Sequence, residues 1–278
     1  MSIIAKPLIA PSKPNPTPVP SSPLPLSVFI IAFNEADRIG PTIEAVRELT
    51  DDLVVIDSGS TDGTQEIASR LGGRVIHNSW PGYGPQKRFA EDQCRHNWIL
   101  NVDADEVVSP RLAASIRALF EGSGPAADGY ETTIAEIFPG EREPHPWGHT
   151  LSPVRLYRLD RGRYVDSTVH DRVHFNVSPR IERLKGKIHH FSVRSLGDEI
   201  AKLNSYTEQQ AEDLDLRGKT LNTWRILTEF PLNFLKAYIG RRHFVRGLYG
   251  IATATNYAYF RFLRLAKHME RRRMRDLE

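Results

Sequence analysis

The sequence predicts an α/β protein with a mostly parallel sheet and helices on both faces. Short apolar runs rich in β-branched residues alternate with segments of helical periodicity between residues 26 and 120. The apolar runs end in polar clusters of Asp, Asn, Ser and Gly, as buried strands do where they lead into loops. Strands that alternate with helices form a largely parallel sheet, because each helix returns the chain to the same edge.

The sheet is expected to begin after an extended tail. Residues 1–25 contain eight prolines and little charge, which disfavours both helix and strand. The run LSVFIIAF (26–33) is typical of a strand buried on both faces, and apolar residues at helical spacing between 39 and 49 predict the first helix. The run DLVVIDSGSTDGT (52–64) predicts a second strand that ends in a glycine-rich turn.

The alternation continues with a helix, a strand, a helix and a strand. The segments are TQEIASRLGG (64–73), RVIH (74–77), GPQKRFAEDQCRH (84–96) and NWILNVD (97–103). Ser109 before Pro110 is a typical N-cap and first-turn pair, and it predicts that a helix starts at residue 110.

The alternation weakens after residue 122. Three strand-like segments, 129–138, 152–159 and 171–177, are separated by loops rich in Pro, Gly and His, and they predict an antiparallel extension that completes a site. From Leu196 the pattern is helical again. We therefore expect a tail (1–25), an α/β domain (26–195) and a helical, basic and aromatic extension (196–278).

Composition limits the possible classes of protein. The 278 residues carry a formal charge of +3, and the segment from Lys236 to Glu278 holds eleven basic residues against three acids, which suits a polyanionic surface. The single cysteine, Cys94, excludes an intramolecular disulfide and suits a reducing compartment. We expect neither secretion nor a membrane span, since no signal-peptide pattern and no uncharged run of sufficient length occurs.

Polar clusters follow three of the predicted strands: Asn34–Glu35, Asp57–Ser60 and Asp103–Asp105. In open α/β sheets ligands bind beyond the carboxyl ends of the strands, so the three clusters are expected to meet at one crevice. The alternative for each is helix capping, which is the better interpretation for Asp62.

The sequence NVDADE (101–106) places three carboxylates within four positions. Closely packed like charges need a cation, a proton or full solvation. A divalent ion held by one or two carboxylates, with substrate phosphates completing its shell, satisfies this need. A D-x-D motif alone is a weak signal of a metal site, but its position at a strand end makes it informative.

Together these motifs resemble family 2 glycosyltransferases, which have the Rossmann-like GT-A fold. Within that family the chain resembles the bacterial lipopolysaccharide-core glycosyltransferases of the WaaE (KdtX) type, from Leu26 to the C-terminus, with residues 137–152 matching least well. The matching segments are IAFNEADRIG, LVVIDSGSTDGT, GYGPQKRFA, WILNVDADEVVSP, VHDRV and RLKGKIHHFSVRS.

The resemblance implies roles for individual residues, with 26–195 as the catalytic domain. The residues expected to line the nucleotide-sugar pocket are Ala32, Phe33, Asn34, Glu35, Asp57 and Ser58, with Asp57 at the uracil or ribose. Lys87 matches a basic residue that approaches the diphosphate, although a lysine on a helix face is ordinarily only solvated. Asp103 and Asp105 match the pair that holds Mn²⁺ or Mg²⁺, and the second usually binds the metal directly.

The implied reaction is inversion by a single displacement, which needs a carboxylate base. Asp171 in VHDRV is the candidate because the family pattern is usually V-H-E, and Asp166 and Glu136 are rivals. His170 is assigned to the acceptor side. Arg155 either contacts phosphate or sugar or pairs with a carboxylate within the fold.

We therefore expect a hexosyltransferase that moves sugar from a UDP-sugar to a lipid-linked saccharide. The uncharged run from Gly247 to Phe260 is bracketed by arginines, which suits either an interfacial helix on an anionic membrane or a helix packed onto the protein. The first option predicts a cytoplasmic protein attached to the inner face of the bacterial inner membrane.

Three alternatives remain at this point. Transfer to polyprenyl phosphate is the nearest one. A nucleotidyltransferase would need a glycine-rich phosphate loop where this chain has Asn34–Glu35. A non-catalytic nucleic-acid-binding protein is favoured only by the arginine-rich end, so no nucleic acid partner is expected.

Overall fold

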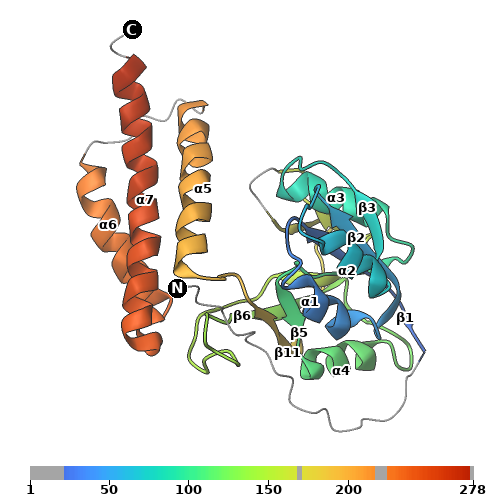
Figure 1. The fold of residues 1–278 in the computed structure, drawn as a ribbon. Helices are drawn as coiled ribbons and strands as arrows, with labels where there is room; N and C mark the ends of the chain where they lie inside the picture. Colours follow the sequence, from blue (N-terminus) through green and yellow to red (C-terminus); the bar gives the residue numbers. More distant parts are fainter. Residues whose placement is uncertain (1–21, 168–170, 217–223, 276–278) are drawn as a thin grey trace, which may run out of the picture. The chain divides into compact units, whose positions relative to one another are not determined.

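The computed structural model describes residues 22–167, 171–216 and 224–275, which form two compact units. The first unit comprises the described residues up to Ile134 and those between Leu151 and His190, and the second comprises Ala135–Thr150 and the described residues from Phe191 onward. Figure 1 shows the sheet and its helices in the first unit and a group of helices in the second.

The first unit alternates strands and helices up to residue 119. Its helices are α1 (Ile39–Val46), α2 (Thr64–Arg70), α3 (Tyr83–Asp92) and α4 (Pro110–Leu119). Its strands are β1 (Leu24–Ala32), β2 (Thr50–Asp57), β3 (Arg74–His77), β4 (Trp98–Asn101), β5 (Glu106–Val108), β8 (Val154–Arg158), β9 (Gly162–Tyr164), β10 (Val173–Phe175) and β11 (Ile181–His190). Strands β6 (Gly129–Glu136) and β7 (Thr150–Leu151) contain residues of both units.

The main sheet is mixed, with the order β3-β2-β1-β4-β8-β6-β11-β5 and β7 beside β6. Its first four strands are parallel, whereas β8 pairs antiparallel with both β4 and β6, and β11 pairs antiparallel with β5. A separate two-stranded sheet joins β9 and β10. The predicted α/β class is confirmed, and the strands after residue 122 form the antiparallel pairs that were expected. Strands β5 and β11 are not among the strands predicted from the sequence.

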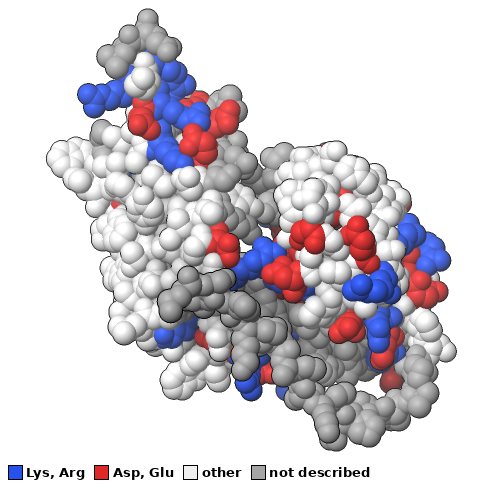
Figure 2. Space-filling model, viewed as in Figure 1, with Lys and Arg blue, Asp and Glu red and all other residues white. Residues whose placement is uncertain are grey.

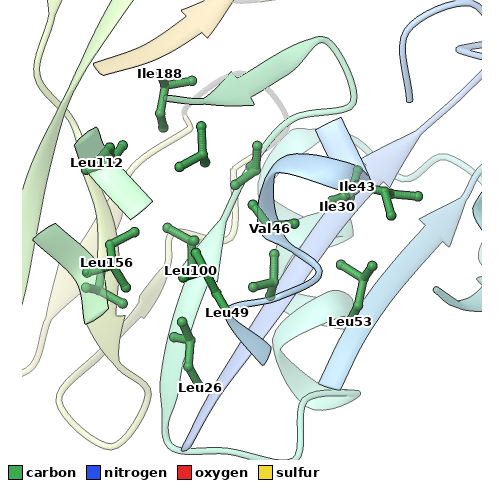
Figure 3. Packing of buried hydrophobic residues seen from close by; sticks show 14 of the residues in the cluster. Leu26, Ile30, Ile43, Val46, Leu49, Leu53, Leu100, Leu112, Leu156 and Ile188 are labelled. Carbon is green, nitrogen blue, oxygen red and sulfur yellow. The ribbon is translucent and has the colours of Figure 1, made fainter. Parts of the chain in front are cut away.

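Alternate residues of β1 face two separate cores. Leu26, Val28 and Ile30 pack with α1, α2 and α4 on one face, and Figure 3 shows this cluster with Ile43 and Leu112. Phe29 and Ile31 point to the other face. There they pack with Ala90 of α3 and with two buried tyrosines, Tyr157 and Tyr164. Full burial of one such side chain stabilises by roughly 1.5–3 kcal/mol, so the central strands are held firmly in register.

The start of α4 follows its sequence signal. The Ser109 hydroxyl accepts a hydrogen bond from the amide of Leu112, and Pro110 occupies the first turn. Helix α4 therefore begins immediately after β5, and the cap at Ser109 fixes the end of the segment that contains the acidic loop.

The second unit is mainly helical. It contains α5 (Leu196–Leu216), α6 (Arg225–Leu235), the π-helix η1 (Lys236–Gly240), the 3₁₀ helix η2 (His243–Arg246) and α7 (Gly247–Arg275). Helix α7 packs against both α5 and α6. Within the described ranges, no helix combines the length and the apolar character needed to cross a bilayer.

Segment 135–150 belongs to this helical unit. Phe138 packs edge-on against His243 and Tyr249, and the Arg246 guanidinium lies 4.0 Å from the centre of the Phe138 ring. Arg246 also donates to Glu141 at 2.9 Å. These contacts fix the segment to the start of α7.

Candidate active site

The loops after β1 and β2 are joined by hydrogen bonds at the carboxyl ends of the parallel strands. Asn34 has a φ of 55°, a left-handed conformation that asparagine tolerates better than most residues. Its amide donates to Ser60 Oγ at 2.8 Å, and its side-chain oxygen accepts from the Thr61 amide at 2.9 Å. The two predicted strand-end clusters therefore form one structure.

Asp57 is fully buried at the end of β2 and organises the following loop. Its Oδ1 accepts from the amides of Gly59 and Ser60 at 2.9 Å each and from Gln65 Nε2 at 2.7 Å, while Oδ2 accepts from the Ser60 hydroxyl. Both oxygens are thus used in shaping the loop. The hydroxyl of Ser58 accepts from Gln86 Nε2 at 3.0 Å, which connects the same loop to α3.

The loop after β1 presents side chains of different character. Ala32 is buried and Phe33 is 56% exposed. Glu35 accepts two hydrogen bonds of 2.7 Å from Arg38, and Arg38 lies 3.5 Å from Asp105. This arrangement links the first strand end with the third.

Lys87 lies at the centre of the site and is completely buried. Its Nζ is 3.0 Å from Asp103 Oδ1, donates to Asp171 Oδ2 at 2.7 Å, and lies 5.0 Å from the centre of the Tyr164 ring. Burial lowers the pKa of Lys87, but Asp103, Tyr164 and Asp171 together outweigh that effect and the pKa is raised. Lys87 is therefore a charged group within the fold and not a solvated surface lysine.

Arg155 completes the neutralisation of Asp103. It donates to Asp103 at 2.9 Å, to Glu106 at 2.8 Å and to the side chain of Asn101. Burial raises the pKa of Asp103, but Arg155 and Lys87 hold it well below its usual range. Of the two roles left open for Arg155, the structure shows pairing with carboxylates.

Glu106 supports the acidic loop from inside the fold. It is 1% exposed, and its Oε2 accepts from the amide of Asp103 at 2.9 Å. Burial raises the pKa of Glu106 in spite of the nearby Arg155. The three carboxylates of NVDADE therefore have different environments, and Glu106 is structural.

Asp105 is the carboxylate of this loop with the loosest pairing. Its side chain is 15% exposed, and its oxygens lie 3.5 Å from Arg38 and 3.5 Å from His190. Burial raises the pKa of Asp105, but His190 and Arg38 together outweigh that effect and lower the pKa below its usual value, so the group is held as a carboxylate. Burial lowers the pKa of His190, but the carboxylates around it, first of all Asp105, outweigh that effect and raise the pKa above its usual value.

The residues present fit a divalent ion that takes much of its shell from the substrate. Within the described part of the chain, no group of three or more His, Cys, Asp or Glu side chains is arranged to hold a metal alone. Mg²⁺-type sites need only one or two carboxylates when phosphates and water supply the other ligands. Asp105 meets this requirement, whereas Asp103 is already engaged by Lys87 and Arg155.

The three candidate bases have different positions. Asp171 is one-third exposed and is bonded to Lys87. Asp166 is exposed, and Glu136 belongs to the helical unit. His170, assigned to the acceptor side, lies outside the described residues.

Sequence reasoning missed several partners in the site. Asn101 accepts from Tyr164 and from Arg155, and it closes the network on the β4 side. Arg38 and His190 flank Asp105. His190 stood within a motif of the resemblance, but its nearness to Asp105 depends on the antiparallel pairing of β11 with β5, in which His190 lies opposite Glu106.

Comparison with known proteins now identifies the family. The model for "Glycosyl transferase family 2" matches residues 27–180, which include the parallel strands and the acidic loop. The chain belongs to glycosyltransferase family 2. The GT-A fold class implied by the sequence resemblance is thereby confirmed.

Two relatives of this family 2 glycosyltransferase align over most of their lengths. A glycosyltransferase of Rickettsia prowazekii (strain Madrid E), described as uncharacterized, is 38% identical over 250 residues, 87% of this chain and 86% of the relative. The lipopolysaccharide core biosynthesis glycosyltransferase LpsC of Rhizobium meliloti (strain 1021) is 31% identical over 267 residues, 89% of this chain and 93% of the relative.

Similarity to solved structures is partial. The glucosyl-3-phosphoglycerate synthase of Mycobacterium tuberculosis, crystallised with Mn²⁺, UDP and glucosyl-3-phosphoglycerate, is 25% identical with a TM-score of 0.32. The alignment covers 42% of this chain and 45% of that chain, so this chain spans less than half of the synthase.

Proposed function

We propose that this glycosyltransferase is a metal-dependent, inverting hexosyltransferase that moves sugar from a UDP-sugar to a lipid-linked saccharide. The observation that carries the proposal is Asp105, which lies loosely paired beside the charge-balanced Asp103 at the carboxyl ends of the parallel strands. The relative named for lipopolysaccharide core biosynthesis supports a saccharide acceptor of the cell envelope.

Asp105 and Asp103 form the acidic edge that would face a nucleotide diphosphate. A bound Mn²⁺ or Mg²⁺ would supply positive charge against the departing diphosphate. Lys87 and Arg155 hold the Asp103 carboxylate in place, and Glu106 fixes its backbone amide. These contacts keep the acidic loop in one geometry before the donor binds, as preorganised sites require.

Asp171 would act as the base of the displacement. Its Oδ2 is bonded to Lys87, which orients the carboxylate, and one third of the side chain is exposed. Oδ1 can accept the proton of an acceptor hydroxyl as that oxygen bonds to the anomeric carbon and the bond to the diphosphate oxygen breaks. The position of the carboxylate matters here, because a base must lie within hydrogen-bond reach of the proton it takes.

Thermal unfolding with UDP and Mn²⁺ tests the donor site. We expect UDP with Mn²⁺ to raise the melting temperature more than UDP alone, and Asp105→Asn to remove the metal-dependent part of the shift. Asp160→Asn is the matched control, because Asp160 is a partly exposed carboxylate at the far end of β8 paired with Arg158. A metal-dependent shift that persists in Asp105→Asn would contradict the assignment of this carboxylate.

Turnover measurements test the base. Asp171→Asn is expected to reduce turnover roughly 10²–10⁴-fold while UDP binding is nearly retained, since the base acts on the acceptor. Asp166→Asn is the control, because this exposed carboxylate lies five residues earlier in the chain. Loss of turnover in Asp166→Asn with retention in Asp171→Asn would move the base to Asp166.

A further inference from the structure

Helix α6 exposes large apolar side chains and buries its acidic residue, which is the reverse of the usual arrangement on a protein surface. Its acidic residue, Glu229, is only 5% exposed and pairs with Arg225 at 3.0 Å and with Arg264 of α7 at 3.4 Å. Large apolar side chains of α6 and η1 are exposed instead: Leu227, Phe230, Leu232, Leu235 and Ile239. A helix on a water-soluble surface ordinarily turns its apolar stripe inward and its charges outward.

The helical spacing separates the two faces clearly. At 100° per residue, Leu227, Leu232 and Leu235 lie on one broad side of the helix, and Glu229 lies on the other with Asn233. Asn233 donates to the carbonyl oxygen of Glu229 at 2.7 Å, and Glu229 pairs with Arg264 of α7, so the inward side of α6 contains paired polar groups. The outward side of α6 is accordingly mainly apolar, with the exposed Thr228 among its leucines, and this side is called the apolar strip below.

The strip continues into the elements that follow α6. Phe244 of η2 is 47% exposed, and Leu248 at the start of α7 is 85% exposed. In Figure 2 the side of this unit formed by α6 is nearly without charged side chains, whereas Lys and Arg gather toward the C-terminal end of α7. Large contiguous apolar patches of this kind mark interaction sites in soluble proteins.

The charges of the same stretch favour an anionic partner. Between residues 224 and 268 the chain has eight basic residues and one acid, and that acid is the buried Glu229. Lys236 and Arg242 are exposed next to the apolar strip. Two copies that met through this face would bring like-charged rims together, whereas anionic lipid headgroups complement both the apolar strip and its basic rim.

We propose that the outward face of α6, η1 and η2 is a membrane-binding surface for bilayers that contain anionic lipid. The strip enters the boundary between headgroups and acyl chains, and the basic rim contacts the headgroups. This surface differs from the expected interfacial run of 247–260, since Gly250, Thr253, Ala254 and Ala258 of that run are buried. The inference is independent of the donor and acceptor proposed above.

Vesicle sedimentation with the full chain tests the surface. We expect binding to vesicles of phosphatidylethanolamine with phosphatidylglycerol, and about tenfold or greater weakening in Leu232→Glu/Leu235→Glu, because two exposed leucines are removed and two negative charges are added. Leu151→Glu/Val177→Glu is the matched control, since Leu151 and Val177 are similarly exposed in the α/β unit. This control is expected to bind as the unsubstituted chain does.

A second pair of substitutions tests the basic rim. Lys236→Glu/Arg242→Glu is expected to weaken binding to the anionic vesicles and to reduce its salt dependence. Equal binding of the control and of Leu232→Glu/Leu235→Glu would overturn the proposal, and so would failure of the unsubstituted chain to bind. Dimerisation in sedimentation velocity that Leu232→Glu abolishes, without vesicle binding, would assign the face to a second copy. The UDP and Mn²⁺ thermal shift, measured on the same variants, reports separately on the donor site.

Discussion

At the scale of single residues, the acidic loop after β4 depends on one buried guanidinium. Arg155 reaches Asp103, Glu106 and Asn101 from the neighbouring antiparallel strand β8. Three carboxylates in four positions would repel if they were left alone, so the fold supplies Arg155 and Lys87 as internal counter-charges. The remaining carboxylate, Asp105, keeps the looser pairing that suits a ligand site.

Replacing Arg155 by methionine is expected to destabilise the chain by about 3–5 kcal/mol, because Glu106 is left buried without its partner. Arg158→Met on the same strand is the control, since Arg158 is partly exposed and its pair with Asp160 contributes about 1 kcal/mol or less. Urea unfolding measures both variants. Equal losses for the two arginines would contradict the central role of Arg155.

Asp52 is expected to make stability depend on pH under acidic conditions. Burial raises its pKa, but the Ser27 hydroxyl, the Arg95 amide and two arginines lower it from 3.8 to about 2. Because the folded-state pKa lies below the unfolded value, the stabilisation is present above about pH 4 and is lost as the pH falls toward 2. The expected contribution is about 2 kcal/mol.

The measurement is urea unfolding over a pH series. Asp52→Asn is expected to be less stable than the unsubstituted chain at neutral pH, with the difference narrowing between pH 4 and pH 2. Glu44→Gln, an exposed carboxylate on α1, serves as control and is expected to change stability by less than about 0.5 kcal/mol. A pH-independent loss in Asp52→Asn would mean that packing and not charge accounts for its effect.

At the scale of elements, local patterns predicted the parallel half of the sheet but not the pairing of the antiparallel half. The segments that form β1 and β2 are continuous apolar runs, which predict buried strands. The polar residues that follow each run could therefore be placed at the strand ends without any knowledge of the strand pairing. Strand β5 was missed because Glu106–Val108 is short. Strand β11 was missed because its apolar residues Ile181, Leu184 and Ile188 are spaced by three and four positions, which is the period of a helix and not of a strand. The contacts of Arg155 and His190 depend on those long-range pairings, which no local spacing reports.

Gly186 lies where β11 passes close to the start of α4. It has a φ of 102°, and a Cβ there would lie 2.4 Å from the backbone nitrogen of Leu112. Gly186→Ala is therefore expected to destabilise by about 3 kcal/mol or more, through both steric overlap and backbone strain. Gly122→Ala separates the two causes, because Gly122 also has positive φ, 65°, but no atom lies within 4 Å of its Cβ position.

The loss in Gly122→Ala is expected to be about 1–2 kcal/mol, the cost of the left-handed conformation alone. Thermal unfolding compares the two variants. If they were equally destabilised, the close approach of β11 to α4 would not be rigid.

At the scale of the whole molecule, segment 135–150 connects two strands of the sheet but belongs to the helical unit. The polypeptide leaves the sheet through β6, packs Phe138 and Glu141 against the residues at the start of α7, and returns through β7. The sequence predicted a single domain over residues 26–195. Within that range, residues 137–152 resembled the family least. The contacts of Arg246 with Phe138 and Glu141 explain why this segment belongs to the helical unit and not to the sheet.

A fragment that ends at His190 is therefore expected to fold incompletely, although it retains every strand of the main sheet. Ile137 and Phe138 are buried in the full chain, and the fragment lacks the His243, Arg246 and Tyr249 side chains that contact Phe138. The fragment should bind a hydrophobic dye and melt at a lower temperature than the full chain. A chain that ends at Glu270 is the control, because it keeps every one of these partners and loses only the last residues of α7, with the ion pairs of Arg271 and Arg275 to α5. A fragment ending at His190 that binds no dye and melts with the full chain would show that segment 135–150 needs no support from the helices.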